Sequence, residues 1–137
     1  MSKIRIINII LVFSCLVMGG YPFLNVASCN AVFEMESDHY KVSGRCERGR
    51  INSTIINKDY QDSYLIEGRL AMLGEQYFIF VDNVSVIEQS KQVSSRLKKY
   101  KYQRSIMSGR YIDNHIFTYT PYPHMGKVNI VGRLSIW

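Results

Sequence analysis

Most of the chain after residue 30 alternates between apolar and polar positions, which is typical of half-buried β-strands. The clearest case is 63–72, where Tyr64, Ile66, Gly68 and Leu70 share one face. The alternation predicts strands over 31–35, 39–46, 51–56, 63–72, 77–87, 111–120 and 127–137. Polar turns and Gly or Pro separate them, at 36–38, 48–49, 57–62, 74, 108–109 and 121–126, and 101–107 fits a strand or a helix.

The apolar period changes once, over 88–100, where Val93, Leu97 and Tyr100 form a helical stripe. The short turns predict a mainly antiparallel sheet, and the mid-strand glycines Gly44, Gly68 and Gly132 predict bulges or bends. The expected fold is therefore mainly β (α+β). It is a small antiparallel curved sheet or barrel, with one helix that closes an end or covers a face.

The first thirty residues have a different pattern. Lys3 and Arg5 precede a charge-free stretch that runs from Ile6 to Phe33, with the apolar run IINIILVFSCLVMGG at its centre. A basic start followed by an apolar segment is typical of an export signal or a membrane anchor, and the basic residues stay in the cytoplasm. A buried core helix is disfavoured because the segment has almost no polar face. Pro22 predicts a poor helix in its last part.

Three fates of this segment remain open. It is a retained inner-membrane span, a signal cleaved after Val26-Ala27-Ser28, or the leader of a lipoprotein acylated on Cys29. The predicted division of the chain is 1–28 as signal or transmembrane anchor and 29–137 as a β-rich domain. All three fates put that domain outside the cytoplasm, in the periplasm.

The three cysteines have separate interpretations. Cys15 lies in the apolar segment and is expected to be inert. Cys29 and Cys46 are predicted to form a disulfide, which persists in an exported domain and closes a loop worth about 3 kcal/mol. The alternative is a lipid on Cys29 and a free buried thiol at Cys46. No cysteine and histidine spacing indicates a metal site or a cofactor.

Charge and candidate chemistry favour a binding protein over an enzyme. The formal charge is +6, but Lys3 and Arg5 lie outside the domain, whose charge of +4 gives little reason to expect nucleic acid. No nucleophile or Gly-rich loop motif is present. Histidines and acidic residues are interpreted as solvated surface groups: His39, His115, His124, Glu34, Glu36, Asp38, Asp59 and Asp62.

Two features leave a choice between a structural and a functional interpretation. The basic residues Arg96, Lys98, Lys99, Lys101 and Arg104 form either a solvated helix face or a patch for an acidic partner or anionic lipid headgroups. The many aromatic residues of the domain either fill a small barrel or line a pocket for an apolar ligand. The last strand, 127–137, is a candidate edge for a partner strand.

The plan of the chain resembles the FidL-like enterobacterial membrane proteins. The likeness rests on the basic start, the apolar segment, Cys29, and three motifs: YKVSG at 40–44, LIEGRL at 65–70 and GEQYFI at 74–79. The resemblance extends to the PsaF, MyfF and ToxS group of periplasmic companions. It implies a lipocalin-like barrel that binds and stabilises the periplasmic domain of a ToxR-like membrane transcription regulator in virulence or fimbrial gene control. Some such pairs sense bile salts.

Three hypotheses about function follow. The first is a membrane-anchored periplasmic companion of a membrane-bound regulator. The second is an envelope lipoprotein with a structural or assembly role, such as a pilot or fimbrial accessory protein. The third is a barrel that carries an apolar ligand such as a bile salt.

Overall fold

The computed structural model describes residues 3–59, 61–88, 106–120 and 124–136. Within these ranges one helix, α1, precedes eight strands. The elements are α1 (Lys3–Asn25), β1 (Asn30–Glu36), β2 (Tyr40–Glu47), β3 (Arg50–Asn57), β4 (Asp62–Leu73), β5 (Gln76–Glu88), β6 (Ile106–Ile112), β7 (His115–Thr120) and β8 (His124–Arg133). The predicted mainly β fold with alternating faces is confirmed, since β1 has the burial pattern of a strand with one face inside.

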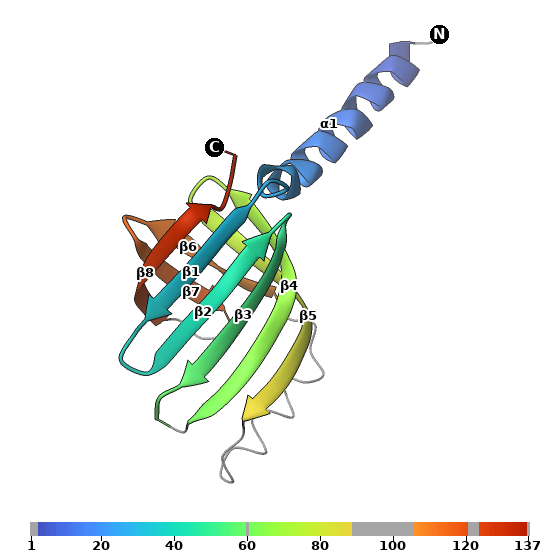
Figure 1. The fold of residues 1–137 in the computed structure, drawn as a ribbon. Helices are drawn as coiled ribbons and strands as arrows, with labels where there is room; N and C mark the ends of the chain where they lie inside the picture. The colour runs from blue at the N-terminus through green and yellow to red at the C-terminus, as the bar shows by residue number, and fades with distance from the viewer. Residues whose placement is uncertain (1–2, 60, 89–105, 121–123, 137) are drawn as a thin grey trace.

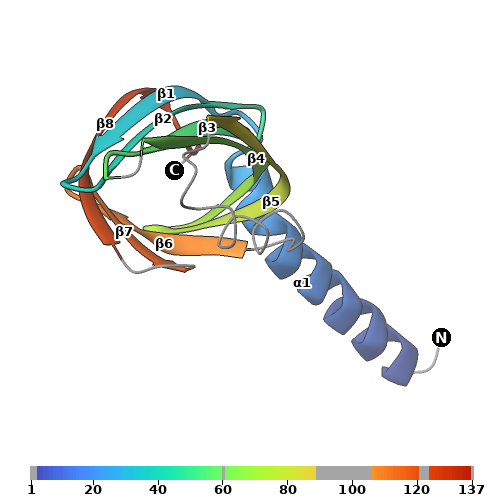
Figure 2. The same ribbon diagram turned by 90° about the horizontal axis from the view of Figure 1, so that it is seen from below.

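The eight strands form a closed antiparallel barrel in sequence order, and Figure 2 shows them as a ring. The barrel closes between β1 and β8, where Asn30 lies opposite Arg133 and Glu36 lies opposite Lys127. Of the two architectures left open by the sequence, the barrel is therefore the one observed. In the closed barrel each strand is paired on both sides along at least part of its length, unlike the end strands of an open curved sheet.

The helix α1 extends away from one end of the barrel (Figure 1). Its apolar side chains are largely exposed over Ile4–Leu24, so it is not a core helix. It is the one segment among the described residues that is long and apolar enough to cross a bilayer, at about 1.5 Å per residue over Ile4–Asn25. This finding fits a membrane span or a signal sequence equally.

The prediction of a poor helix near Pro22 is wrong, because α1 continues to Asn25. Contacts with the barrel stabilise its last turn. The Phe23 ring lies against the Phe80 ring of β5, with 5.4 Å between centroids. The Asn25 side-chain amide donates a hydrogen bond to the Met72 carbonyl oxygen at 3.2 Å.

Immediately after α1 the chain turns in and closes the barrel end. Val26 is fully buried, and Cys29 is bonded to Cys46 of β2, which confirms the predicted disulfide. Val26 and the disulfide pack with Leu70, Met72 and Tyr77 in one buried cluster. We call this end, next to α1, the floor of the barrel.

The opposite end is the mouth. The turns that connect β1 to β2 and β3 to β4 lie there, because β1 and β3 both run from the floor to the side away from α1 (Figure 1). The strands therefore carry the chain back and forth between a floor closed by the disulfide and a mouth bordered by polar turns.

The expected boundaries of the later strands need a correction. A single strand was predicted over 111–120 with a break at Ser108-Gly109, whereas β6 runs through Ser108-Gly109 and a turn at Asp113-Asn114 separates it from β7. Both turn residues have positive φ, 49° and 62°, which Asp and Asn tolerate and two-residue hairpins require. The break seen in the sequence at Ser108/Gly109 is instead a register shift between β6 and β7.

The sequence predicts bends at mid-strand glycines, and the strand pairing confirms one at Gly68. Between Glu67 and Gly68 the pairing of β4 with β5 shifts, as a β-bulge does. A Cβ at Gly68 would approach the Phe80 carbonyl oxygen to 2.5 Å, so only glycine fits there. Gly132 has φ +109°, a conformation that L-residues rarely adopt.

The predicted helix over 88–100 lies almost wholly outside the described residues. Only Glu88 belongs to the described part, where it ends β5. The segment 101–107 is described from Ile106, which begins β6.

The disulfide is expected to supply much of the stability of the floor. It closes a loop with a sequence separation of 17, so the double variant Cys29→Ala/Cys46→Ala should lose about 3 kcal/mol of unfolding free energy. Urea unfolding of the full chain in detergent micelles, followed by circular dichroism, measures this loss. Cys15→Ala on the exposed surface of α1 is the control. A double variant with the same midpoint as the control would contradict the prediction.

Candidate ligand cavity

The interior of the barrel contains a cavity of about 850 Å³. All eight strands contribute to its wall, and it extends from the floor to the turns at the mouth. Its volume lies within the usual range for sites that enclose one small organic molecule. A closed barrel of eight strands has an interior that side chains fill or that holds one small ligand, and here much of it is open.

The deeper part of the cavity is apolar. The residues that line it come from opposite sides of the ring: Ile51, Ile66, Leu70, Met72, Ile79, Val81, Ile116 and Ile130. Five aromatic side chains also line the cavity: Phe33, Tyr40, Tyr64, Tyr77 and Tyr111. These five aromatic side chains therefore surround open volume and do not fill the barrel completely.

A row of polar residues crosses the wall near the mouth. Tyr40 of β2 lies opposite Asn57 of β3, and Asn57 lies opposite Asp62 of β4. All three line the cavity, and Asn57 and Asp62 are buried. Ser53, two residues before Ile55 on β3, is also buried and faces the cavity. The cavity is thus amphipathic, with a polar band below the mouth and an apolar interior beyond it.

The burial of Asp62 corrects the interpretation of this residue as a solvated turn group. Asp62 is 0% exposed, whereas Asp59 in the preceding turn is exposed as predicted. The reason is its position two residues before Tyr64, which puts both side chains on the inner face of β4. The Tyr64 hydroxyl donates a hydrogen bond to Asp62 Oδ2 at 3.4 Å. The alternation of β4 begins at Asp62, one residue before the strand that the sequence predicts over 63–72.

The phenols of Tyr64, which is half-buried, and Tyr77, which is buried, stay neutral. Burial first, and then the nearby Asp62 carboxylate, raise the pKa of Tyr64 to about 12. Burial also raises the pKa of Tyr77, whose hydroxyl shares a hydrogen bond of 2.8 Å with the Thr118 hydroxyl. Both tyrosines therefore present a hydroxyl group and no charge to the cavity at neutral pH.

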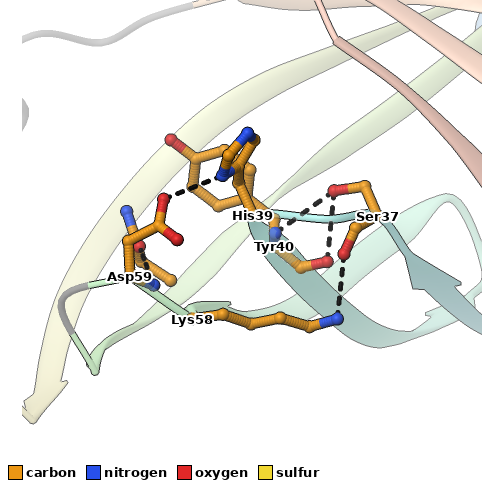
Figure 3. A network of polar contacts seen from close by, with 6 residues as sticks. Ser37, His39, Tyr40, Lys58 and Asp59 are labelled. Atoms are coloured by element: carbon orange, nitrogen blue, oxygen red, sulfur yellow. Dashed lines mark hydrogen bonds and ion pairs between the residues drawn. The ribbon is translucent and has the colours of Figure 1, made fainter.

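Hydrogen bonds tie together the two described turns at the mouth (Figure 3). The His39 imidazole donates to the Asp59 carboxylate at 2.9 Å, and the Lys58 ammonium donates to the Ser37 carbonyl oxygen at 2.9 Å. Lys58 also forms a salt bridge of 2.8 Å with Glu36, and this hydrogen bond holds the pKa of Glu36 below its usual value. These bonds fix the rim of the mouth on the side formed by β1 to β4.

The other predicted surface groups fall into two sets. Glu34, Glu36, Asp38 and His39 are exposed, as expected, while His115 is half-buried and donates from Nδ1 to the Asp113 carbonyl oxygen at 2.9 Å. The remaining residues lie outside the side chains that the structure describes. They are His124 and the five residues of the basic tract, Arg96, Lys98, Lys99, Lys101 and Arg104.

The sequence predicts a free edge over 127–137, but only part of the strand β8 is one. Residues His124–Lys127 pair with β7, and the Val128 amide donates to the Asn114 carbonyl oxygen at 2.8 Å. Beyond that point, Asn129–Arg133 pair with β1 on one side. On their other side no strand among the described ranges pairs with them. This free edge is five residues long and lies near the floor.

The disulfide and lipidation of Cys29 exclude each other, because acylation needs the thiol. In this structure the Cys29 sulfur is bonded to Cys46 and also accepts a hydrogen bond from the Gly49 amide at 3.1 Å. Within the ranges that the structure describes, no three His, Cys, Asp or Glu residues are grouped so that they could hold a metal ion.

Comparison with known proteins adds no assignment. No protein family, no curated protein and no solved structure matches the chain. The cavity and the free edge of β8 therefore carry the functional argument.

Proposed function

We propose that the protein is a membrane-anchored barrel of the bacterial envelope that binds one amphipathic small molecule in its cavity. The observation that carries this proposal is the cavity of about 850 Å³ in the centre of the fold. Protein interiors are normally packed as densely as organic crystals, with few voids larger than a water molecule. An interior this open in a domain of this size is expected where a ligand occupies it.

The lining indicates the chemical class of the ligand. The apolar interior favours a rigid hydrocarbon body, and the band formed by Tyr40, Asn57 and Asp62 favours hydroxyl or amide groups near the mouth. A steroid acid such as a bile salt has this distribution of polar and apolar groups. The helix α1 supports the membrane anchor, with the barrel in the periplasm.

Filling the cavity should weaken binding. Ile130 lines the cavity, while the next residue, Val131, is 68% exposed on the outside of the same strand. Ile130→Trp should weaken binding of deoxycholate to the full chain in nanodiscs about tenfold or more, because the indole ring occupies the ligand's volume. Val131→Trp is the matched control and should bind as the wild type does. Calorimetric titration measures both, and equal affinities for the two variants would contradict the proposal.

A second candidate function is that of a companion to a membrane-bound transcription regulator, whose periplasmic domain it binds and stabilises. The observation that favours it is the free edge of β8 at Asn129–Arg133. Unpaired backbone groups on a sheet edge bind an extended segment of a partner by strand addition. The edge lies near the floor, close to the end of α1. A regulator with its own membrane span presents its periplasmic domain at a similar distance from the membrane.

A charge beside this edge should prevent strand addition. Val131→Lys puts a lysine next to the edge, and natural sheets use lysine there to block pairing. A membrane-bound winged-helix regulator encoded beside this chain should then lose the protection that the wild-type protein gives it. Pulse-chase measurement of its half-life in co-expressing cells tests this.

The matched control for that experiment is Val32→Lys. Val32 lies opposite Val131 and is 49% exposed, but its strand β1 is paired on both sides. The control should protect the regulator fully. A half-life that is the same with Val131→Lys as with the wild type, or the same with and without the wild-type protein, would contradict the companion role.

A further inference from the structure

A row of residues on the outside of the barrel leads from the β2–β3 turn to α1. Glu47 lies opposite Arg50, Arg50 lies opposite Arg69, and Arg69 lies opposite Phe80. The Phe80 ring contacts Phe23 in the last turns of α1. This outer surface at the floor is therefore continuous with the end of the helix.

Arginines dominate this surface. Arg45, Arg48 and Arg50 line one surface hollow of about 340 Å³ together with Glu47 and Asn52. All three arginines are exposed, and none forms a salt bridge with another residue in the described ranges. We call Arg45, Arg48 and Arg50 the floor arginines.

Like charges also face each other here. Arg50 lies directly opposite Arg69, an arrangement that destabilises a sheet unless an anion lies between or beside the two groups. Asp82 pairs with Arg69 at 3.4 Å, whereas Arg50 lies opposite Glu47 and forms no salt bridge within the described ranges. At the mouth, by contrast, Lys58 is paired with Glu36 and His39 with Asp59. Among the described residues that line the hollow near α1, Glu47 is the one acidic residue beside three arginines, so this surface carries a local excess of positive charge.

The joint between α1 and the barrel fixes how far this surface lies from the helix end. The Arg48 amide donates to the Cys29 carbonyl oxygen at 3.0 Å, and the Ile136 amide donates to the Asn25 carbonyl oxygen at 2.9 Å. Tyr21 and Phe23, 40% and 42% exposed, are aromatic residues at the end of an apolar helix, a position typical of the membrane–water interface. If α1 spans a bilayer, the floor arginines lie at the depth of the headgroups.

We propose that the floor arginines are a docking surface for the anionic phospholipid headgroups of the bilayer that α1 enters. Guanidinium groups bind phosphate oxygens through paired hydrogen bonds, and the local excess of arginine over glutamate matches an anionic surface. Docking holds the barrel in one orientation, with its floor on the membrane and its mouth directed away from it. The inference rests on the part of the proposed function in which α1 is a retained span.

The test uses the full chain, isotopically labelled, in nanodiscs that contain a gadolinium-chelating lipid. The readout is the paramagnetic relaxation of backbone amides in the β2–β3 hairpin. Replacing part of the phosphatidylcholine by phosphatidylglycerol should raise these relaxation rates about threefold, because the attraction acts within a Debye length of the surface. Raised salt should reverse the change.

The variant Arg45→Gln/Arg48→Asn/Arg50→Gln should abolish this dependence on anionic lipid. Asparagine is chosen at Arg48 because this residue has φ 50°, which asparagine tolerates. The matched control, Lys41→Gln/Lys58→Gln/Lys127→Gln, removes three cations from the half of the barrel near the mouth and should retain the dependence. Equal rates in both lipid compositions, or a dependence that survives in the arginine variant, would overturn the proposal.

Hydrogen exchange of the α1 amides in the same samples tests the membrane insertion of α1 separately from the docking of the floor arginines. Protected amides over 4–24 establish that the helix is inserted, so that a missing lipid dependence then counts against the docking surface alone. Exchanging amides would overturn the docking surface together with the anchor. Ligand binding in the cavity is measured independently and is unaffected by either outcome.

Discussion

The Cys29–Cys46 bond joins the first residues after α1 to the second strand of the barrel, and the other features depend on this joint. It holds the chain where Val26 enters the floor, so the buried cluster of Val26, Leu70, Met72 and Tyr77 closes one end of the ring. With that end closed and attached to α1, access to the interior is left to the opposite end. The Cys29–Cys46 bond therefore bears on two features: the end of the barrel at which the cavity opens, and the position of the floor arginines next to α1.

The interior is densely packed near the floor and open toward the mouth. Near the floor, buried aliphatic groups and the disulfide stabilise the fold, each fully buried large apolar side chain contributing about 1.5–3 kcal/mol. Toward the mouth, the wall residues surround open volume, and the buried polar groups Asn57 and Asp62 border it. A site that gives up packing contacts in this way recovers them when a ligand fills it. The barrel therefore combines a packed floor with an open half near the mouth.

Sequence reasoning predicted the features that depend on local periodicity. The alternation of Tyr64, Ile66 and Leu70 gave the inward face of β4, and the positions of Cys29 and Cys46 gave the disulfide. It failed where a contact between distant residues decides the outcome. Pro22 lies within a helix because Phe23 and Asn25 bind to the barrel, and Asp62 is buried because the ring closes around it.

The sequence alone does not show whether the barrel is hollow or filled. Aromatic and aliphatic residues on the inner face fit a filled barrel as well as a hollow one, since the difference depends on how far the strands stand apart. The sequence predicts an edge over 127–137 but not its extent, because the free part results from the stagger of β7 against β8 after Val128. Both features arise from the geometry of closure, which couples residues far apart in the chain.

The most direct test of the hollow barrel is the location of a bound amphipath by nuclear Overhauser effects from isoleucine methyl groups of the full chain. With deoxycholate as the ligand, cross-peaks are predicted to Ile51 and Ile66, which line the cavity. None is predicted to Ile56 or Ile106, which are 38% and 53% exposed on the outside. Cross-peaks confined to Ile56, Ile106 or α1 would contradict the account, because they would place the ligand on the outer surface.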